Sequence, residues 1–314
     1  MSTPARLRLA TRGSALALAQ SELVAESLRR QWPGLEVELH LVVTEGDRRR
    51  DVATSELGGK GVFTAGVQRA VLEDEADFAV HSAKDLPAEQ VPGLVLAAVP
   101  EREDPRDVLL GPEGALPGLA ALAEGARVGT GSPRRAALIA ADRPDLKIVA
   151  IRGNVDSRVR RVRGGELEAV VLAAAGLRRL GMRDEAARPL APGTFIPAPG
   201  QGCLAIEARE DDTATQGLLG ALTHRPSRIA LRGERAFLAK LGGSCTLPAG
   251  AILTVEETRL EMVGFLAAED GRGMVRERLA GPSDDPEGLG AGLAWRLLEQ
   301  AGPEVVRLVE SNRK

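Results

Sequence analysis

Several arginines stand where a predicted strand passes into a predicted helix. In the segment 128–135, VGTGSPRR, Ser132 is suited to cap a helix, which places Arg134 and Arg135 in its first turn. A cation there faces the positive end of the helix dipole, which costs about 0.3–1 kcal/mol. A bound anion would reverse that cost, so these residue types at this spacing indicate an anion site.

The same arrangement recurs at two other places. Arg12 comes shortly before Ser14 at the start of a predicted helix, and Arg152 precedes a helix that carries Arg158. Open α/β sheets bind ligands at the carboxyl ends of their strands. Three such places therefore predict a site for a ligand with several carboxylate or phosphate groups. The alternative is that each arginine is solvated or paired with a nearby acid.

Asp85 lies in the segment 78–87, FAVHSAKDLP, where a predicted strand ends in a loop that contains proline. A carboxylate among cations stays ionised, accepts N–H hydrogen bonds and stabilises a developing positive charge. By itself this pattern is also typical of an ordinary surface loop.

The two cysteines differ in their surroundings. Cys245 lies in the segment 241–248, LGGSCTLP, where small neighbours leave the thiol accessible for covalent chemistry, although a buried structural thiol is the alternative. For Cys203 in PGQGC, a buried structural role is the better interpretation. A cysteine hydrolase with His81 as its base finds no further support, because none of the three histidines is near Cys245 in the chain.

Composition argues against several classes of protein. The net charge is -3, from 41 basic and 44 acidic residues, and aromatic residues are 2% of the chain with no Tyr, which disfavours nucleic-acid binding. The basic run Arg158, Arg160, Arg161 and Arg163 also fits a nucleic-acid patch, but for its last three members a solvated helix face is the better interpretation. The chain lacks the glycine spacing of nucleotide-binding loops and any Cys/His metal cluster. Two cysteines and no long apolar N-terminal stretch indicate a soluble protein of the cytoplasm.

The elements that position these residues follow a βα pattern. Strands are expected at 6–10, 37–43, 77–80, 127–129, 147–151 and 170–173, and helices after Ser14, at 64–75, after Ser132 and after Asn154. Pro/Gly-rich segments near 100–105 and 192–202 look like crossings between two α/β domains. Beyond residue 222 we expect a helix at 227–241, a hairpin of strands 260–266 and 274–279, and helices that begin at Pro286 and Pro303.

Taken together, the motifs resemble those of the porphobilinogen deaminase family. The resemblance runs from residue 8 to about residue 250, and its ten stretches occur in the order that the family has. They are ATRGSALALAQ, TEGD, GGKGVFT, AVHSAKDLP, DPRDVLL, VGTGSPRRAAL, IRGNVDSR, LAAAGLRRLG, PAPGQGCLAIE and LGGSCTLPAG.

The resemblance implies two doubly wound α/β domains like those of periplasmic binding proteins, with the active site between them, and a small α+β C-terminal domain. We expect the first domain at 1–101 and 200–219, the second at 105–196, and the third, with the cofactor cysteine, at 222–314.

The family's activity is also implied. It is that of a cytoplasmic, monomeric transferase of porphyrin biosynthesis, which condenses four porphobilinogen molecules with loss of ammonia on a dipyrromethane cofactor and then releases hydroxymethylbilane by hydrolysis. Cys245 matches the cysteine that holds this cofactor by a thioether bond, and Asp85 matches the catalytic aspartate. No metal, nucleic-acid or membrane partner is implied. Residues matching those that hold the acetate and propionate groups of cofactor and substrate are Arg12, Ser14, Lys60, Ser82, Lys84, Thr130, Ser132, Arg134, Arg135, Arg152, Arg158 and Arg179, while Phe63 and Gln201 match other residues of the same cleft.

Three positions depart from the family pattern. Glu56 stands where many members have Lys, and Ser244 and Cys203 replace commoner small residues. The competing hypothesis from another class is a non-catalytic two-domain protein that binds a small polyanion with the same arginines and needs no Cys245.

Overall fold

The computed structural model describes residues 6–44, 61–62, 64–243 and 247–313. It divides into two compact units, Met1–Glu103 with Cys203–Arg228, and Asp104–Gly202 with Ile229–Lys314. The chain passes between the units at 103/104 and 202/203, at or near the ends of the two Pro/Gly-rich segments, and again at 228/229.

The first unit is built on a five-stranded mixed sheet in the order β2-β1-β3-β10-β4. Strand β1 pairs in parallel with β2 and β3, whereas β10 is antiparallel to both β3 and β4. Helices α1 and α7 pack on one face and α3 packs on the other. The elements are β1 (Arg6–Arg12), α1 (Ala15–Gln31), β2 (Glu36–Val42), α3 (Ala65–Leu72), β3 (Phe78–Ser82), the 3-10 helix η1 (Ala83–Asp85), β4 (Leu94–Ala98), β10 (Leu204–Arg209) and α7 (Thr213–Gly220).

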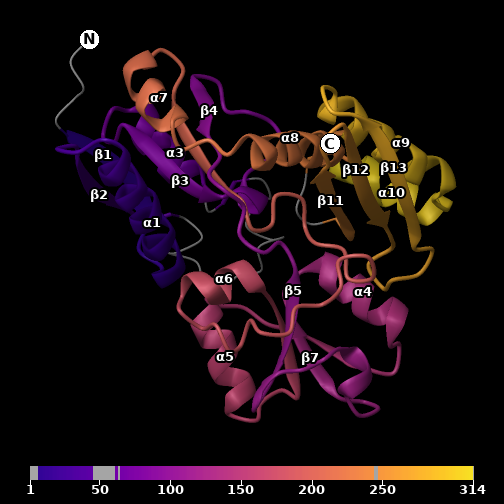
Figure 1. Cartoon of the computed structure of the whole chain (residues 1–314). Coiled ribbons are helices and arrows are strands. Elements are labelled where there is room, and N and C mark those ends of the chain that lie inside the picture. Colours follow the sequence, from indigo (N-terminus) through magenta and orange to yellow (C-terminus); the bar gives the residue numbers. More distant parts are fainter. Residues whose placement is uncertain (1–5, 45–60, 63, 244–246, 314) are drawn as a thin grey trace. The chain divides into compact units, whose positions relative to one another are not determined.

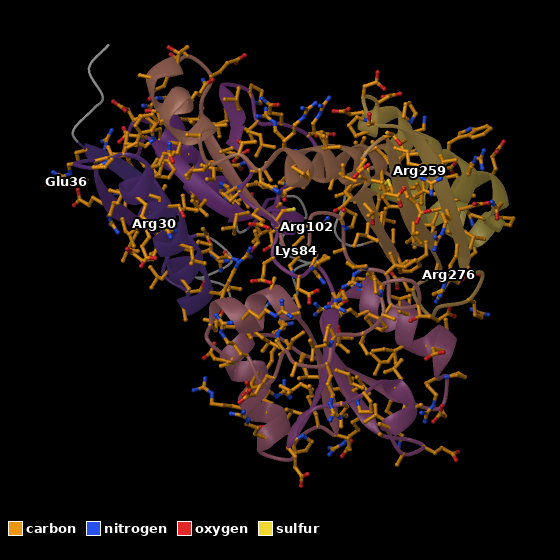
Figure 2. The ribbon with its side chains drawn as sticks, viewed as in Figure 1. Arg30, Glu36, Lys84, Arg102, Arg259 and Arg276 are labelled. Carbon is orange, nitrogen blue, oxygen red and sulfur yellow. The ribbon has the colours of Figure 1, made fainter. Side chains whose placement is uncertain are left out.

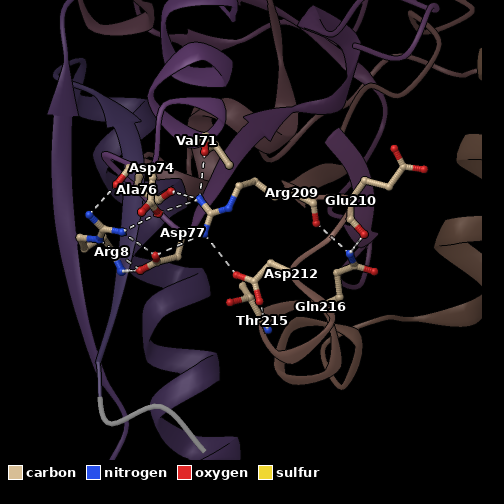
Figure 3. Close-up of polar contacts among 10 residues, drawn as sticks. All are labelled: Arg8, Val71, Asp74, Ala76, Asp77, Arg209, Glu210, Asp212, Thr215 and Gln216. Atoms are coloured by element: carbon tan, nitrogen blue, oxygen red, sulfur yellow. Dashed lines mark hydrogen bonds and ion pairs between the residues drawn. The ribbon is translucent and has the colours of Figure 1, made fainter. Parts of the chain in front are cut away.

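A network of ion pairs and hydrogen bonds connects the strands of this sheet at the end where β1 begins (Figure 3). Asp77 accepts hydrogen bonds from the backbone and the guanidinium of Arg8, and Arg209 donates to the carbonyls of Val71 and Ala76. Asp212 forms an ion pair with Arg209 and accepts a hydrogen bond from the Thr215 amide at the start of α7. The network thus joins β10 and α7 to strands that precede them by more than a hundred residues.

The second unit contains a sheet in the order β6-β5-β9-β7-β8, in which β7 is parallel to β8 and β9 and β5 is antiparallel to β9. Figure 1 shows α4 on one side of this sheet and α5 and α6 on the other, in agreement with the two core clusters that they form. The elements are β5 (Asp107–Gly111), β6 (Gly114–Ala115), the 3-10 helix η2 (Leu119–Ala121), β7 (Arg127–Thr130), α4 (Pro133–Asp142), β8 (Lys147–Ala150), α5 (Val155–Arg163), β9 (Ala169–Ala173) and α6 (Ala174–Arg179).

The second unit also holds a small antiparallel sheet in the order β11-β12-β13. Helix α9 packs against strands β12 and β13 of this sheet (Figure 1). Phe265 and Ala267 of this part join the core beneath α4, which is why it forms one compact unit with the preceding sheet. The predicted division into separate domains at 105–196 and 222–314 therefore stays a prediction. The elements are α8 (Arg225–Lys240), β11 (Ala249–Val255), β12 (Arg259–Leu266), β13 (Val275–Pro282), α9 (Pro286–Gln300) and α10 (Pro303–Asn312).

The predicted fold class, two doubly wound α/β sheets and a small α+β part, is confirmed. The hairpin expected after residue 260 is β12 and β13 in antiparallel register, and helices begin at Pro286 and Pro303 as expected. Strands β4, β5, β6, β10 and β11 were not predicted from the sequence.

Candidate functional site

In the first unit, five of the predicted site residues follow the carboxyl ends of two neighbouring strands. Strands β1 and β3 are parallel, with Leu9 opposite Phe78, so they end at the same edge of the sheet. Arg12 ends β1, and Ser14 caps α1 by accepting the Ala17 amide at 3.3 Å. The residues that follow along β3 and η1 are Ser82, Lys84 and Asp85. Figure 2 shows Lys84 far from Glu36, which begins β2 at the opposite end of the sheet.

Hydrogen bonds from α1 hold this edge together. The amide of Gln20 bonds to the Ser82 hydroxyl at 2.9 Å, which connects α1 to the end of β3. The Ser21 hydroxyl donates to Thr11 Oγ1 at 2.7 Å, which connects the same helix to the end of β1. Gln20 was not among the predicted site residues, and its position less than two turns after the capping Ser14 is the local signal that could have indicated its role.

Asp85 is exposed at the end of the short helix η1, whose backbone is anchored from both sides. The Ala83 amide donates to the Cys203 carbonyl at 3.0 Å, and the Leu86 side chain is buried. The carboxylate is therefore carried on a fixed turn and remains open to solvent. It is placed to accept hydrogen bonds from an N–H group or to stabilise a positive charge.

In the second unit, a second group of predicted residues follows the carboxyl ends of β7, β8 and β9. Thr130 ends β7 and accepts the Ser132 amide, and the Ser132 side chain caps α4. A Cβ on Gly131 would lie 2.6 Å from the Ile151 carbonyl oxygen, so only glycine allows this turn to approach the end of β8. Arg152 follows β8, and the Arg158 guanidinium donates back to the Gly153 carbonyl at 2.9 Å.

Arg134 and Arg135 point inward from the first turn of α4 onto Asp107 of β5. Each guanidinium donates to a different oxygen of this fully buried carboxylate at 2.7 Å. Burial raises the pKa of the Asp107 carboxyl, but the charges of Arg134 and Arg135 outweigh burial and hold that pKa below its ordinary value. These two arginines are thus paired with an acid, the alternative considered for them above. Their direct contact with a ligand stays a prediction.

Asp107 was not among the predicted site residues, although it lies in DPRDVLL, one of the matching stretches. It also accepts a hydrogen bond from Gln201 Nε2 at 3.0 Å. Arg179, at the end of α6, donates to the Gly202 carbonyl at 2.7 Å. Gln201 therefore belongs to the same cluster as Arg134 and Arg135, and Arg179 contacts the residue that follows Gln201, where the chain leaves this unit.

Three basic residues of α5 lie on a solvated helix face, as predicted from the sequence in place of a nucleic-acid patch. Arg160 pairs with Asp156, Arg161 with Glu166 and Arg163 with Glu185, all on the surface. His81 is buried 3.2 Å from Glu207 in the first unit, and Cys203 is buried as expected.

Five residues singled out from the sequence lie outside the described residues, namely Glu56, Lys60, Phe63, Ser244 and Cys245. Within the described ranges, no group of three or more His, Cys, Asp or Glu side chains is arranged to hold a metal ion. No helix in the part of the chain that was searched combines the length and the apolar character needed to cross a membrane.

Comparison with known proteins gives two family matches. Residues 7–217 match the model of the porphobilinogen deaminase dipyrromethane cofactor-binding domain, and residues 229–299 match that of the porphobilinogen deaminase C-terminal domain. Porphobilinogen deaminase of Roseiflexus sp. (strain RS-1) is 46% identical over 94% of this chain and 97% of its own length. That of Thermus thermophilus is 46% identical over 94% and 96%.

Solved structures with a partial likeness include the methionine-binding protein MetQ, with a TM-score of 0.43 and 14% identity over 70% of this chain and 90% of that chain. The periplasmic VFT2 domain of BvgS from Bordetella pertussis gives a TM-score of 0.39 and 17% identity over 69% and 86%.

Proposed function

This chain belongs to the porphobilinogen deaminase family, enzymes of tetrapyrrole biosynthesis with a dipyrromethane cofactor, and on that premise we propose how its residues share the reaction. The reaction is the deaminating condensation of four porphobilinogen molecules, with release of hydroxymethylbilane. Asp85 is the catalytic carboxylate, Cys245 anchors the cofactor, and the basic residues at the two sheet edges bind carboxylate groups.

The observation that carries this proposal is the grouping of side chains at the edge formed by β1 and β3. Two cations, two hydroxyl groups and one exposed carboxylate follow these adjacent parallel strands. Porphobilinogen carries two carboxylates and an aminomethyl group, so it needs cations at one end and an acceptor for positive charge at the other. Arg12 and Lys84 are the cations that bind the carboxylates, and Asp85 is the group that stabilises the positive charge.

The residues at each edge also fit the carboxylate groups of a cofactor. Guanidinium groups form paired hydrogen bonds with carboxylates, and hydroxyl groups complete the remaining acceptor positions. In the second unit Arg152, Arg158 and Arg179 and the hydroxyls of Thr130 and Ser132 form such a set of donors. When bound, the dipyrromethane supplies the pyrrole carbon onto which new units are added.

The role of Asp85 follows from the departure of ammonia, which leaves a positive charge on the substrate. When the C–N bond of the aminomethyl group breaks, the electron pair departs with ammonia and positive charge spreads over the pyrrole ring of the substrate. The Asp85 carboxylate stabilises that charge and accepts the pyrrole N–H hydrogen bond. Because η1 is anchored by the Ala83 amide and by buried Leu86, the carboxylate needs little reorganisation during this step.

The cofactor assignment is tested by the intact mass of the denatured protein. We expect a mass above that of the sequence by one covalent dipyrrole, and we expect Cys245→Ser to lose the increment. Cys203→Ser is the matched control, since these are the two cysteines of the chain, and it should keep the adduct. An adduct retained by Cys245→Ser would refute the anchor. Wild-type protein without any adduct would favour the non-catalytic polyanion binder.

The remaining expectations belong to the same proposal. We infer that the enzyme acts as a monomer in the cytoplasm, and that the second unit comprises two domains, at 105–196 and at 222–314. The separate family matches for residues 7–217 and 229–299 support the start of a further domain between residues 217 and 229.

A further inference from the structure

A buried carboxylate on α8 holds the segment through which the chain leaves the second unit. Glu234 is 0% exposed. One of its oxygens accepts the Gly200 amide at 2.6 Å, and the other accepts the Leu253 amide of β11 at 2.9 Å. A carboxylate that bridges two backbone amides fixes both at once, so Glu234 joins the segment 196–202 to the C-terminal sheet.

The same segment is held on its other side by side chains of the β7 and β9 edge. Arg134 donates to the Ile196 carbonyl and Arg179 donates to the Gly202 carbonyl, both at 2.7 Å. Gln201 donates to Asp107 and to the Pro105 carbonyl. The segment 196–202 therefore carries contacts to Arg134, to Arg179 and to the acid that orients Arg135.

Backbone contacts leave this segment little freedom to adjust. The Ala251 amide donates to the Pro197 carbonyl at 3.0 Å, and a Cβ on Gly250 would lie 2.7 Å from that carbonyl oxygen. Gly200 has a φ of +74°, a conformation that favours glycine, and its amide faces Glu234. A shift at Gly200 must therefore be transmitted along the segment toward Gln201 and Gly202.

We propose that Glu234 is a positioning residue for porphobilinogen binding, which acts through the segment 196–202 to set the guanidinium of Arg179 and the Asp107–Arg135 pair. This inference rests on the proposed role of Arg179 as a ligand contact. It assigns to the C-terminal part of the chain a function besides carrying the cofactor cysteine, namely holding the basic cluster of the preceding sheet in its binding arrangement.

The first test is Glu234→Gln, which keeps the size of the side chain but replaces one acceptor oxygen with a donor. One of the two amides then faces an N–H group and loses its bond. We expect the KM for porphobilinogen to rise about tenfold, because small displacements of binding groups are costly, while kcat changes less than threefold. Hydrogen exchange at the Gly200 amide should accelerate. If Glu234→Gln does not fold, Glu234→Asp provides the same test, since its shorter carboxylate cannot reach both amides.

A matched control separates positioning from general loss of stability. Val309→Ala removes buried apolar volume from the core of the C-terminal sheet without touching the segment 196–202. It should lower the melting temperature and leave KM within twofold of the wild type. An equal rise of KM in this control would overturn the proposal, and so would an unchanged KM in Glu234→Gln despite faster exchange at Gly200.

A double-mutant cycle with Arg179→Lys distinguishes the two proposals. If Glu234 acts through Arg179, the factor by which KM rises in the double variant should be well below the product of the factors in the two single variants. Independent multiplication of the effects would refute the positioning role of Glu234. An unchanged KM in Arg179→Lys alone would instead refute the proposed ligand contact of Arg179.

Discussion

At the scale of single residues, two aspartates near the predicted site have opposite surroundings. Asp85 is exposed on an anchored turn, whereas Asp107 is fully buried between two guanidinium groups. An exposed carboxylate is available to a substrate, and a buried one organises the groups around it. The same residue type therefore orients its neighbours in the second unit, whereas in the first unit we propose that it takes part in the chemistry.

Replacement of Asp85 tests its chemical role. We expect Asp85→Asn to lower kcat about 10²–10³-fold, the usual effect of removing one group that stabilises transition-state charge. The melting temperature should stay close to that of the wild type because the side chain is exposed. Asp211→Asn, at another exposed aspartate of the same unit, serves as the control and should keep full activity. A kcat within threefold of the wild type in Asp85→Asn would contradict the assignment.

At the scale of elements, the site is built from turns at which a strand ends and a helix begins. Ser14 and Ser132 cap α1 and α4 with their side chains, and each helix start is placed by a parallel strand. The approach of the β7–α4 turn to the end of β8 depends on glycine, since a Cβ on Gly131 would collide with the backbone of Ile151.

Gly131→Ala tests the importance of that close approach. Because the obstructing atom is a backbone oxygen, the turn must shift, and we expect a loss of about 1–3 kcal/mol in the free energy of unfolding together with a higher KM. Gly217→Ala in α7 meets no atom within 4 Å and should be neutral or slightly stabilising. Thermal unfolding and steady-state kinetics of both variants provide the measurement. Equal unfolding free energies and equal KM values for the two variants would argue against a tight turn between β7 and α4.

Local patterns predicted the elements with clear beginnings. The strands before Ser14, Ser132 and Asn154 and the helices that follow them were expected from apolar periodicity and capping residues. Strand β10 was missed because Glu207 interrupts its apolar run, and the contacts of this buried acid include His81 and Gln68, which are distant in the sequence. Helix α7 was missed because threonine and glycine, which favour helices weakly, make up half of its eight residues.

The candidate site was likewise predictable only in part. Capping signals and strand ends placed Arg134 and Arg135 at the start of α4, but nothing local indicated that they face inward. Their partner Asp107 belongs to β5, which lies 27 residues before Arg134 and reaches it only through the order of strands in the sheet. Side-chain direction at a helix start depends on such long-range pairing, and sequence spacing alone does not contain it.

At the scale of the whole molecule, buried charges make stability depend on pH. The pKa of Asp107 in the folded chain is lowered, since Arg134 and Arg135 outweigh the effect of burial. Its contribution to stability is therefore complete above the pKa of the unfolded carboxyl, about 3.9, and declines as the pH falls through the lower pKa of the folded state.

Asp107→Asn should remove this dependence. At pH 7 we expect the variant to lose about 3–5 kcal/mol of unfolding free energy, because two buried guanidinium groups lose their counter-charge. The difference from the wild type should narrow as the pH falls below about 3.9, because the unfolded carboxyl of the wild type is protonated there first and the native one only at its lower pKa. Denaturant unfolding followed by circular dichroism at pH 7 and at pH 3 measures both values. A difference that stays constant with pH would show that Asp107 is not the titrating group.

Strand β10 occupies the position between β3 and β4, and Arg209 at its end completes the network shown in Figure 3. During translation, β3 and β4 therefore leave the ribosome with no strand between them until about a hundred later residues have been made, which takes on the order of ten seconds at about 10 residues per second. The nascent N-terminal half must wait with open strand edges while the intervening sheet folds. Unpaired strand edges favour association with other chains, so the newborn chain is exposed to aggregation at this stage of biosynthesis.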